Sequence, residues 1–342
     1  MRPRFDPDSA LGWDAIGLDG LSCFLRCVEA VLQSRGCSRD DVAQALVGPV
    51  DLLRSRSTDF AFRGCEIVWH KVADGRDHWD EIVRLVGEGE PLVLMPDRFF
   101  WPHDELHRAH HFQDHMVLAV ECDQEHLTVL DTDAPPSEGF VRVMPVTDEV
   151  RRACVRYGVV VSRSPEPLTL PHLVTEILAP SIPWLDRDLA SLRHFHETWT
   201  AEDIDDTTAR ALHIVVLGTC QPTFFVLATC LRSLGQGELA ATAATAAAAD
   251  QAARRAKQVG VLLLAMHAQH TASMQALCRN AFGQLIDELD VLLDSMRRMS
   301  PVGVAADAEP RPADATERLR LHDRLRSVAE SIFDAPRPSA VG

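Results

Sequence analysis

The proline-rich segment 162–171 divides the sequence into two halves with different patterns. Before this segment, short apolar runs of strand length alternate with a few helical patterns. After it, the strand pattern fades and helix-forming stretches follow one another. Short strands separated by polar turns are typical of an antiparallel sheet that packs against helices. We therefore expect an α+β domain over residues 1–162 and an all-helical domain over residues 163–299.

The N-terminal half contains the elements of such an α+β domain. The spacing of its apolar residues predicts helices over residues 17–36, 39–47, 79–87 and 148–155. Its short apolar runs predict strands over residues 65–69, 92–95, 116–121, 127–131, 140–143 and 157–161. Gly36 follows the first helical pattern, and glycine at this position commonly ends a helix.

The C-terminal half is predicted to be helical throughout. Residues 172–235 contain several helical segments, and a long helix-forming stretch covers residues 238–299. An alanine-rich run occupies residues 240–249, and because alanine is the best helix former we expect this run to pack closely against a neighbouring helix. Gly260 is the predicted break between two antiparallel helices.

The chain beyond this stretch has a different composition. Residues 300–315 are rich in Pro, Ala and Asp, and we expect them to form a disordered linker. An amphipathic pattern then resumes and predicts a C-terminal helix and tail over residues 316–342.

Composition and charge argue against several classes of protein. An apolar content of 46% over 342 residues is ample for two domains with real cores. The net charge of −16 argues against a protein that binds nucleic acid. No apolar run approaches the roughly 18 residues of a membrane span, and the N-terminus lacks the apolar core of a signal peptide. Nine scattered cysteines are typical of reduced thiols, so we expect a cytoplasmic protein that does not bind membranes.

A cysteine, a histidine and an aspartate occur in the chain order of papain-like cysteine enzymes. With Asp19 or Ser22 as the N-cap of the first predicted helix, Cys23 lies in its first turn, where backbone N–H groups and the helix dipole favour a thiolate. His115 opens one strand run and Asp131 closes the next. An imidazole can take the proton of a thiol, and a carboxylate can orient the imidazole. The order predicts Cys23 as nucleophile, His115 as base and Asp131 as the orienting residue.

Each of these residues also has a purely structural interpretation. A cysteine on an apolar helix is often buried, and an aspartate at a strand end often forms a turn. Cys27, one turn further along the helix, is a rival to Cys23, and Asp133 is a substitute for Asp131. Only the combination of order and spacing favours a catalytic site.

The loop that precedes His115 offers a metal site as an alternative. It contains five histidines, at positions 103, 107, 110, 111 and 115. The four-residue spacing within two pairs of them would place two imidazoles on one helical face, as in zinc sites. No His-Glu-x-x-His or Cys-x-x-Cys motif accompanies them, and Pro102 disfavours a regular helix. We therefore predict no metal ligands and keep a metal-dependent enzyme as an alternative.

These residues and two further segments resemble the butirosin biosynthesis protein H (BtrH-type) N-terminal family. The shared features are the helix from Cys23 to Gly36, the segment Asp97-Arg-Phe-Phe-Trp-Pro102, the segment His111-Phe-Gln-Asp-His115 ahead of a strand, and the strand that ends in Asp131. The resemblance covers approximately residues 15–160, and the segment from Asp97 to Pro102 with the two histidines is its most specific part.

Members of that family are papain-like cysteine acyltransferases of natural-product pathways. The resemblance implies a papain-like (C39-like) domain that moves an acyl or aminoacyl group from a carrier-protein thioester to an amine or alcohol. It implies catalytic roles for Cys23, His115 and Asp131, and substrate contacts from Asp97, Trp101 and His111. It implies no cofactor of the enzyme's own, because the donor protein carries the phosphopantetheine.

The partners implied by the resemblance are an acyl or peptidyl carrier protein and a small-molecule acceptor, with a homodimer left open. Alternatives on the same fold are a thioesterase or cyclase and a C39-like cysteine peptidase. A further alternative is a non-catalytic partner protein that uses its helical half for assembly.

Overall fold

The computed structural model describes residues 22–53, 62–71, 78–102, 107–108, 115–131, 140–154, 156–163, 167–199, 204, 206–235, 240–268, 271–300, 321, 324–326 and 328. Their contacts form two compact units. The first takes in the chain up to Val42 and Cys65–Arg163, and it is α+β with an antiparallel sheet. The second takes in Ala43–Gly64 and Ser164–Ala329, and it is helical. Residues 43–64, assigned to the first domain from the sequence, thus group with the helical unit.

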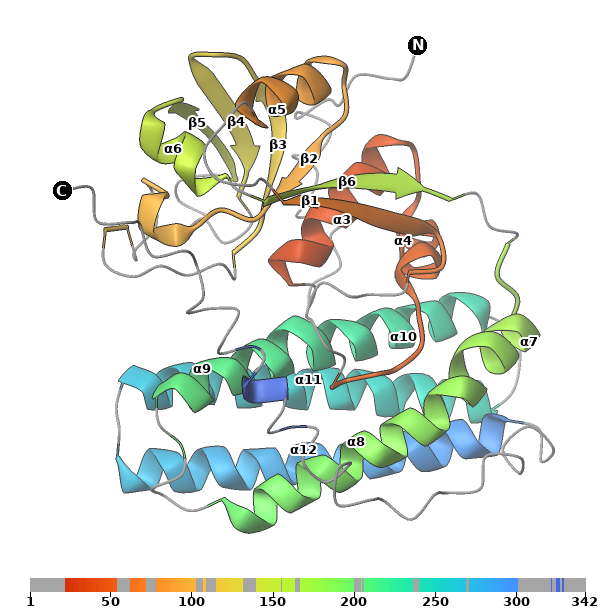
Figure 1. Ribbon diagram of the computed structural model, residues 1–342. Helices are drawn as coiled ribbons and strands as arrows, with labels where there is room; N and C mark the ends of the chain where they lie inside the picture. The colour runs from red at the N-terminus through yellow and green to blue at the C-terminus, as the bar shows by residue number, and fades with distance from the viewer. Residues whose placement is uncertain are drawn as a thin grey trace. The chain divides into compact units, whose positions relative to one another are not determined.

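The α+β unit is built on a six-stranded sheet of order β1-β6-β2-β3-β4-β5, in which every neighbouring pair is antiparallel (Figure 1). The strands are β1 (Cys65–Lys71), β2 (Leu92–Leu94), β3 (Val117–Cys122), β4 (His126–Leu130), β5 (Val141–Pro145) and β6 (Arg156–Ser162). All six lie within two residues of the predicted bounds, because turn-forming residues flank each apolar run.

Helices cover both faces of the central strands. The helices along this part of the chain are α3 (Cys23–Ser34), α4 (Arg39–Leu46), α5 (His78–Gly87) and α6 (Asp148–Ala153), with a short 3₁₀ turn, η1 (Arg98–Phe100), and α3 and α5 contact the central strands. Helix α5 buries Trp79, Ile82 and Val86 against apolar side chains of β2, β3 and β4. Successive side chains of a strand alternate in direction, yet β2 is buried at all three positions. Helix α3 also packs against β2, β3 and β6, which explains this double burial.

The helical unit consists of α7 (Leu170–His172), η2 (Leu173–Leu178), α8 (Ala179–Thr198), α9 (Asp206–Val215), η3 (Val216–Cys220), α10 (Gln221–Leu234), α11 (Ala240–Ala268) and α12 (Ala272–Met299). The segments η2 and η3 are single π-helical turns. Each lies directly before a helix with proline in its first turn, Pro180 in α8 and Pro222 in α10. Proline cannot donate the usual helical hydrogen bond, and a wider turn relieves its clash with the preceding turn.

The alanine-rich run packs closely against its neighbours, as predicted. Helix α11 contacts α9, α10 and α12, and it is the central helix of the unit (Figure 1). Thr245, Ala249 and Ala252 are fully buried on it. Small side chains allow helix axes to approach closely, so this stretch of low complexity is a packing surface.

The predicted break at Gly260 is wrong. Gly260 lies inside α11, and the turn to α12 comes near Thr271, whose hydroxyl accepts a hydrogen bond from the N–H of Met274. A Cβ at position 260 would collide with the side chain of Leu217. The Gly260 carbonyl also accepts a hydrogen bond from Nδ1 of His213, at 3.0 Å. The glycine therefore serves close helix packing and does not end the helix.

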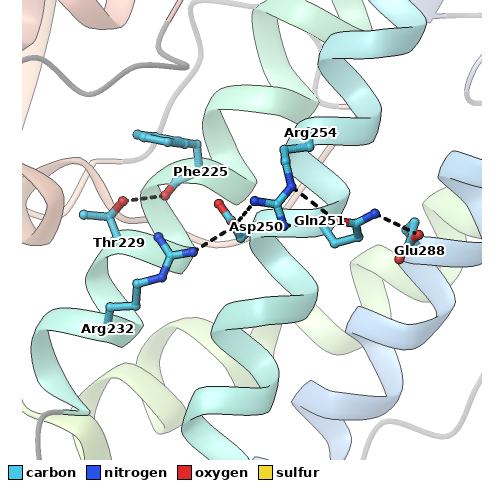
Figure 2. A network of polar contacts seen from close by, with 7 residues as sticks. All are labelled: Phe225, Thr229, Arg232, Asp250, Gln251, Arg254 and Glu288. Carbon is cyan, nitrogen blue, oxygen red and sulfur yellow. Dashed lines mark hydrogen bonds and ion pairs between the residues drawn. The ribbon is translucent and has the colours of Figure 1, made fainter.

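Polar contacts join three helices of this unit (Figure 2). Asp250 on α11 forms ion pairs with Arg232 on α10, at 3.0 Å, and with Arg254 one turn away, at 2.6 Å. Gln251 accepts from Arg254 and donates to Glu288 on α12. Both arginines are more than half exposed, so solvent screens these pairs and each contributes little to stability.

One continuous helical stretch of the described chain, Thr208–Leu234, is long and apolar enough to cross a membrane by length and composition alone. Its apolar runs are not continuous in the sequence, because polar residues such as His213 and Gln221 interrupt them. Its most apolar window is 72% buried inside the structure, and such burial is typical of the core helix of a soluble protein.

The predicted linker after Ser300 lies outside the described residues, as do residues 1–21. Of the predicted C-terminal helix, the structure describes only Leu321, residues 324–326 and Val328, which are helical. The N–H of Leu321 donates to the hydroxyl of Ser191 on α8, at 2.8 Å, which attaches this segment to the helical unit.

Candidate functional site

Cys23 is the first residue of α3. Ser22 precedes the helix in an extended conformation, and its side chain makes no capping hydrogen bond. Helix α3 ends as predicted, because Gly36 adopts a φ of 88°. The N–H groups of Gly36 and Cys37 return to the carbonyls of Gln33 and Leu32 in a Schellman motif. Cys23 is partly exposed, whereas Cys27 is fully buried one turn later. Of the two, only Cys23 is accessible for chemistry.

The orientation of α3 follows from contacts at its two ends. At the C-terminal end, Arg35 donates to the carbonyl of Val160 on β6, at 3.0 Å, and forms an ion pair with Glu90 just before β2. At the N-terminal end, the ring of Phe24 packs 5.9 Å from that of Trp69 on β1. The guanidinium of Arg156, the first residue of β6, lies over the same indole. Helix α3 therefore points its N-terminus toward the edge of the sheet where β6 begins.

The register of the sheet brings several polar residues to that same edge. Leu94, the last residue of β2, pairs with both Val117 at the start of β3 and Tyr157 at the start of β6. Leu118 pairs with Leu130 at the end of β4. The residues that follow β2, precede β3 and follow β4 therefore meet at one edge. They include Asp97, His115 and Asp131.

His115 and Asp131 are in contact at this edge. Nε2 of His115 lies 3.0 Å from Oδ1 of Asp131, and both side chains are only 7% exposed. The backbone N–H of Asp131 donates to the carbonyl of Phe140, at 2.7 Å, and this bond continues the β4–β5 ladder past the end of β4. Asp131 is thus held by the sheet, and its carboxylate faces the imidazole as the sequence order predicted.

Arg142 is part of this group and was missed in the sequence analysis. It lies on β5, and its Nε is 3.5 Å from Oδ2 of Asp131. The arginine side chain is 12% exposed. The only sequence signal is a lone arginine in the pattern Val141-Arg-Val-Met, which is also typical of an exposed strand position. Arg142 reaches Asp131 because the strand register places it opposite Val129 on β4.

The three predicted substrate contacts have different outcomes. Asp97 is buried, and its carboxylate caps η1 by accepting from the N–H of Phe99, at 3.1 Å. Trp101 is 1% exposed and belongs to the core cluster that includes α5, and its contact with substrate stays a prediction. His111 and the alternative Asp133 lie outside the described residues.

The histidine loop is described only in part. Within the ranges that the structure describes, no group of three or more His, Cys, Asp or Glu side chains could hold a metal ion. His107 instead lies 3.6 Å from Glu149, which also pairs with Arg108 at 2.8 Å. His103, His110 and His111 are outside the described residues, so the zinc hypothesis is not tested for them.

Several other thiols are in surroundings that disfavour a thiolate. Burial raises the pKa of the Cys65 and Cys122 thiols to about 12 and that of Cys278 to about 11. Burial also raises the pKa of Cys37, with a further contribution from the nearby charge of Asp41. Of the three partly exposed cysteines, at positions 23, 37 and 122, the last two are thus poor nucleophiles at neutral pH.

Comparison of the sequence with protein-family models and with curated proteins gives no match. The function proposed below is therefore inferred from the residues and their geometry.

Proposed function

We propose that this chain is a cysteine-dependent acyltransferase whose α+β unit is a papain-like (C39-like) domain. Cys23 is the nucleophile, His115 the base and Asp131 the residue that orients the imidazole. The observation that carries the proposal is the buried contact between His115 and Asp131 at the sheet edge toward which the N-terminus of α3 points. The resemblance to the BtrH-type family supports the same assignment.

The position of Cys23 favours the reactive form of its thiol. The N-terminus of a helix carries partial positive charge, which stabilises an anion in the first turn. The first turn of α3 contains no acidic residue, so no carboxylate of that turn offsets this charge. Ser22 makes no side-chain capping bond, so its hydroxyl does not occupy the amides of that turn. A thiolate at position 23 would have these amides as partners.

The contact between His115 and Asp131 determines which nitrogen does the proton transfer. Because Nε2 faces the carboxylate, Nδ1 is the nitrogen that exchanges a proton with Cys23. The carboxylate keeps the imidazole in one tautomer and stabilises the imidazolium that forms when the thiol loses its proton.

The reaction then proceeds through an acyl-enzyme. The thiolate of Cys23 attacks a thioester on the phosphopantetheine arm of a carrier protein, and a bond forms between Sγ and the carbonyl carbon. The bond from that carbon to the phosphopantetheine sulfur breaks, and the departing thiol takes the proton from His115. N–H groups at the start of α3 would hold the transient oxyanion, each contributing about 3 kcal/mol.

The second step releases the acyl group. An amine or alcohol attacks the carbonyl carbon, the bond to Sγ breaks, and the proton of the acceptor passes through Nδ1 of His115 back to the sulfur. Thioester exchange is nearly thermoneutral, and a thiol leaves more readily than an amide nitrogen. This chemistry requires no cofactor of the enzyme's own. We propose natural-product biosynthesis in the cytoplasm as its setting, with a carrier protein and a small-molecule acceptor as partners.

The donor class can be tested with small substrates. The protein is incubated with an acyl-pantetheine thioester and with the matching amide, and its intact mass is recorded. We expect one acyl group from the thioester, none from the amide, and no acylation in Cys23→Ala. Cys27→Ala is the matched control on the same helix and should acylate normally. Cleavage of the amide would indicate a peptidase, and no adduct with either donor would contradict the proposal.

A further inference from the structure

Arg142 makes the second contact of the Asp131 carboxylate. Oδ1 of that carboxylate faces His115, and Oδ2 faces Nε of Arg142 at 3.5 Å. The Arg142 Nε is buried and not aligned for a hydrogen bond, so the contact is electrostatic. The two oxygens of one carboxylate thus lie against two different side chains, one from the segment that precedes β3 and one from β5.

The sheet determines this arrangement. Arg142 pairs with Val129 across β4 and β5, and Val141 pairs with Leu130. The N–H of Asp131 donates to the carbonyl of Phe140, so Asp131 and Arg142 are diagonal neighbours on adjacent strands. Side chains at such positions reach each other without distortion of the backbone.

The charge of Arg142 matters because the carboxylate is buried. A buried carboxylate without a compensating charge is costly, and it lowers that cost by rotating toward solvent or by taking up a proton. Rotation would end its contact with Nε2 of His115, and protonation would remove the charge that stabilises the imidazolium. A guanidinium at Oδ2 keeps the carboxylate charged and keeps Oδ1 directed at the imidazole.

We propose that Arg142 is a positioning residue of the catalytic site, acting through Asp131 on His115 and so on the reactivity of Cys23. This inference rests on the acyltransferase function proposed above, and it adds a fourth residue to that site. Arg142 has no direct contact with substrate in this role. Its effect depends on its charge and on the presence of the aspartate carboxylate.

The test uses iodoacetamide, which needs no knowledge of the natural substrate. The sulfur of Cys23 forms a bond to the methylene carbon and iodide leaves, so the rate at about pH 6 reports the thiolate fraction. The variants are Arg142→Gln, Arg142→Met, Arg142→Lys, His115→Ala, Asp131→Asn and the double variant Asp131→Asn/Arg142→Gln. Thermal unfolding of each variant checks that it folds.

We expect Arg142→Gln and Arg142→Met to slow alkylation of Cys23 about tenfold, within the range of couplings between neighbouring charged groups. Arg142→Lys keeps the charge and should stay within about threefold of the parent rate. In the Asp131→Asn background, Arg142→Gln should have no further effect, because Arg142 acts through the carboxylate. If Arg142 were only structural, Arg142→Gln would slow the alkylation of Cys23 equally in the parent and in Asp131→Asn.

Three results would overturn the inference. In the first, Arg142→Gln is alkylated at the parent rate while His115→Ala is slow. In the second, Arg142→Gln slows alkylation equally in the parent and in Asp131→Asn, and in the third, neither Arg142→Gln nor Arg142→Met folds. The last would assign Arg142 to fold stability alone. A parent rate in His115→Ala is a separate outcome. It would refute the proposed function itself, and the inference about Arg142 with it.

Discussion

Nε2 of His115 lies 3.0 Å from Oδ1 of Asp131, with both side chains buried at the edge of the sheet. In the proposed mechanism this contact leaves Nδ1 of His115 for the proton exchange with Cys23, because the nitrogen that faces the carboxylate cannot also exchange a proton with a thiol. It joins a residue that precedes β3 to one that follows β4, and the antiparallel pairing of these strands brings both residues to the same edge of the sheet. A papain-like mechanism requires this relationship between its base and its orienting residue.

Alkylation should select one cysteine of the nine. At about pH 7 and low iodoacetamide, we expect Cys23 to be modified first, because His115 and the helix N-terminus favour its thiolate. Cys37 and Cys122 are also partly exposed, but burial raises the pKa of each thiol. Peptide mass spectrometry after partial labelling measures the order. Equal, slow labelling of all nine thiols would instead favour a non-catalytic protein.

Replacing Asp131 should separate its charge from its hydrogen bond. In Asp131→Asn the amide oxygen can still accept from Nε2 of His115, so we expect acylation by a thioester to slow by only about tenfold. Asp131→Ala loses both functions and should slow it by about a hundredfold or more. Rates from intact mass under single-turnover conditions distinguish the two. Equal rates in both variants and the parent would show that the aspartate has no role.

The same alanine variant should also be unstable. Asp131→Ala leaves Arg142 buried without the carboxylate it now faces, and breaking a buried pair in this way costs about 3 kcal/mol. Urea unfolding measures the change. The double variant Asp131→Ala/Arg142→Met removes both charges and should recover much of the loss, whereas a purely additive loss would argue against the pair.

The order of local elements was predictable from the sequence, and much of their pairing was not. Turn residues and apolar runs located all six strands, and Gly36 ended α3 as expected. The insertion of β6 between β1 and β2 depends on contacts far apart in sequence, which no local pattern encodes. Arg142 was missed for the same reason, since its partner is set by strand register. Gly260 was misread because its role is close packing against Leu217 inside a continuous helix.

Gly260 should be intolerant of a side chain. The Cβ in Gly260→Ala would collide with Leu217, so we expect a loss of about 1–3 kcal/mol in the free energy of unfolding. Gly218→Ala is a matched control in the same unit, because the nearest atom to its Cβ would lie 3.7 Å away, at an ordinary contact distance. Chemical denaturation compares the two. Equal stability of both variants would contradict the close packing of η3 on α11.

His213 should make the helical unit less stable in acid. Burial lowers the pKa of this imidazole below its ordinary value, and its Nδ1 donates to the Gly260 carbonyl. Since the folded state binds the proton more weakly than the unfolded state, stability is fully present above about pH 6.5 and falls as the pH drops toward the folded pKa. In His213→Asn the amide can donate in place of Nδ1, so the free energy of unfolding should depend less on pH there. An unchanged slope would assign the acid sensitivity to other groups.

The most direct test of the whole account is the intact mass of the protein after incubation with an acyl-loaded carrier protein. We predict that the parent gains one acyl group, that peptide mapping places it on Cys23, and that an amine acceptor then removes it. Cys23→Ala should gain none, while Cys27→Ala behaves as the parent. Full acyl transfer by Cys23→Ala, or an acyl group on any other residue, would contradict the assignment of Cys23 as the nucleophile.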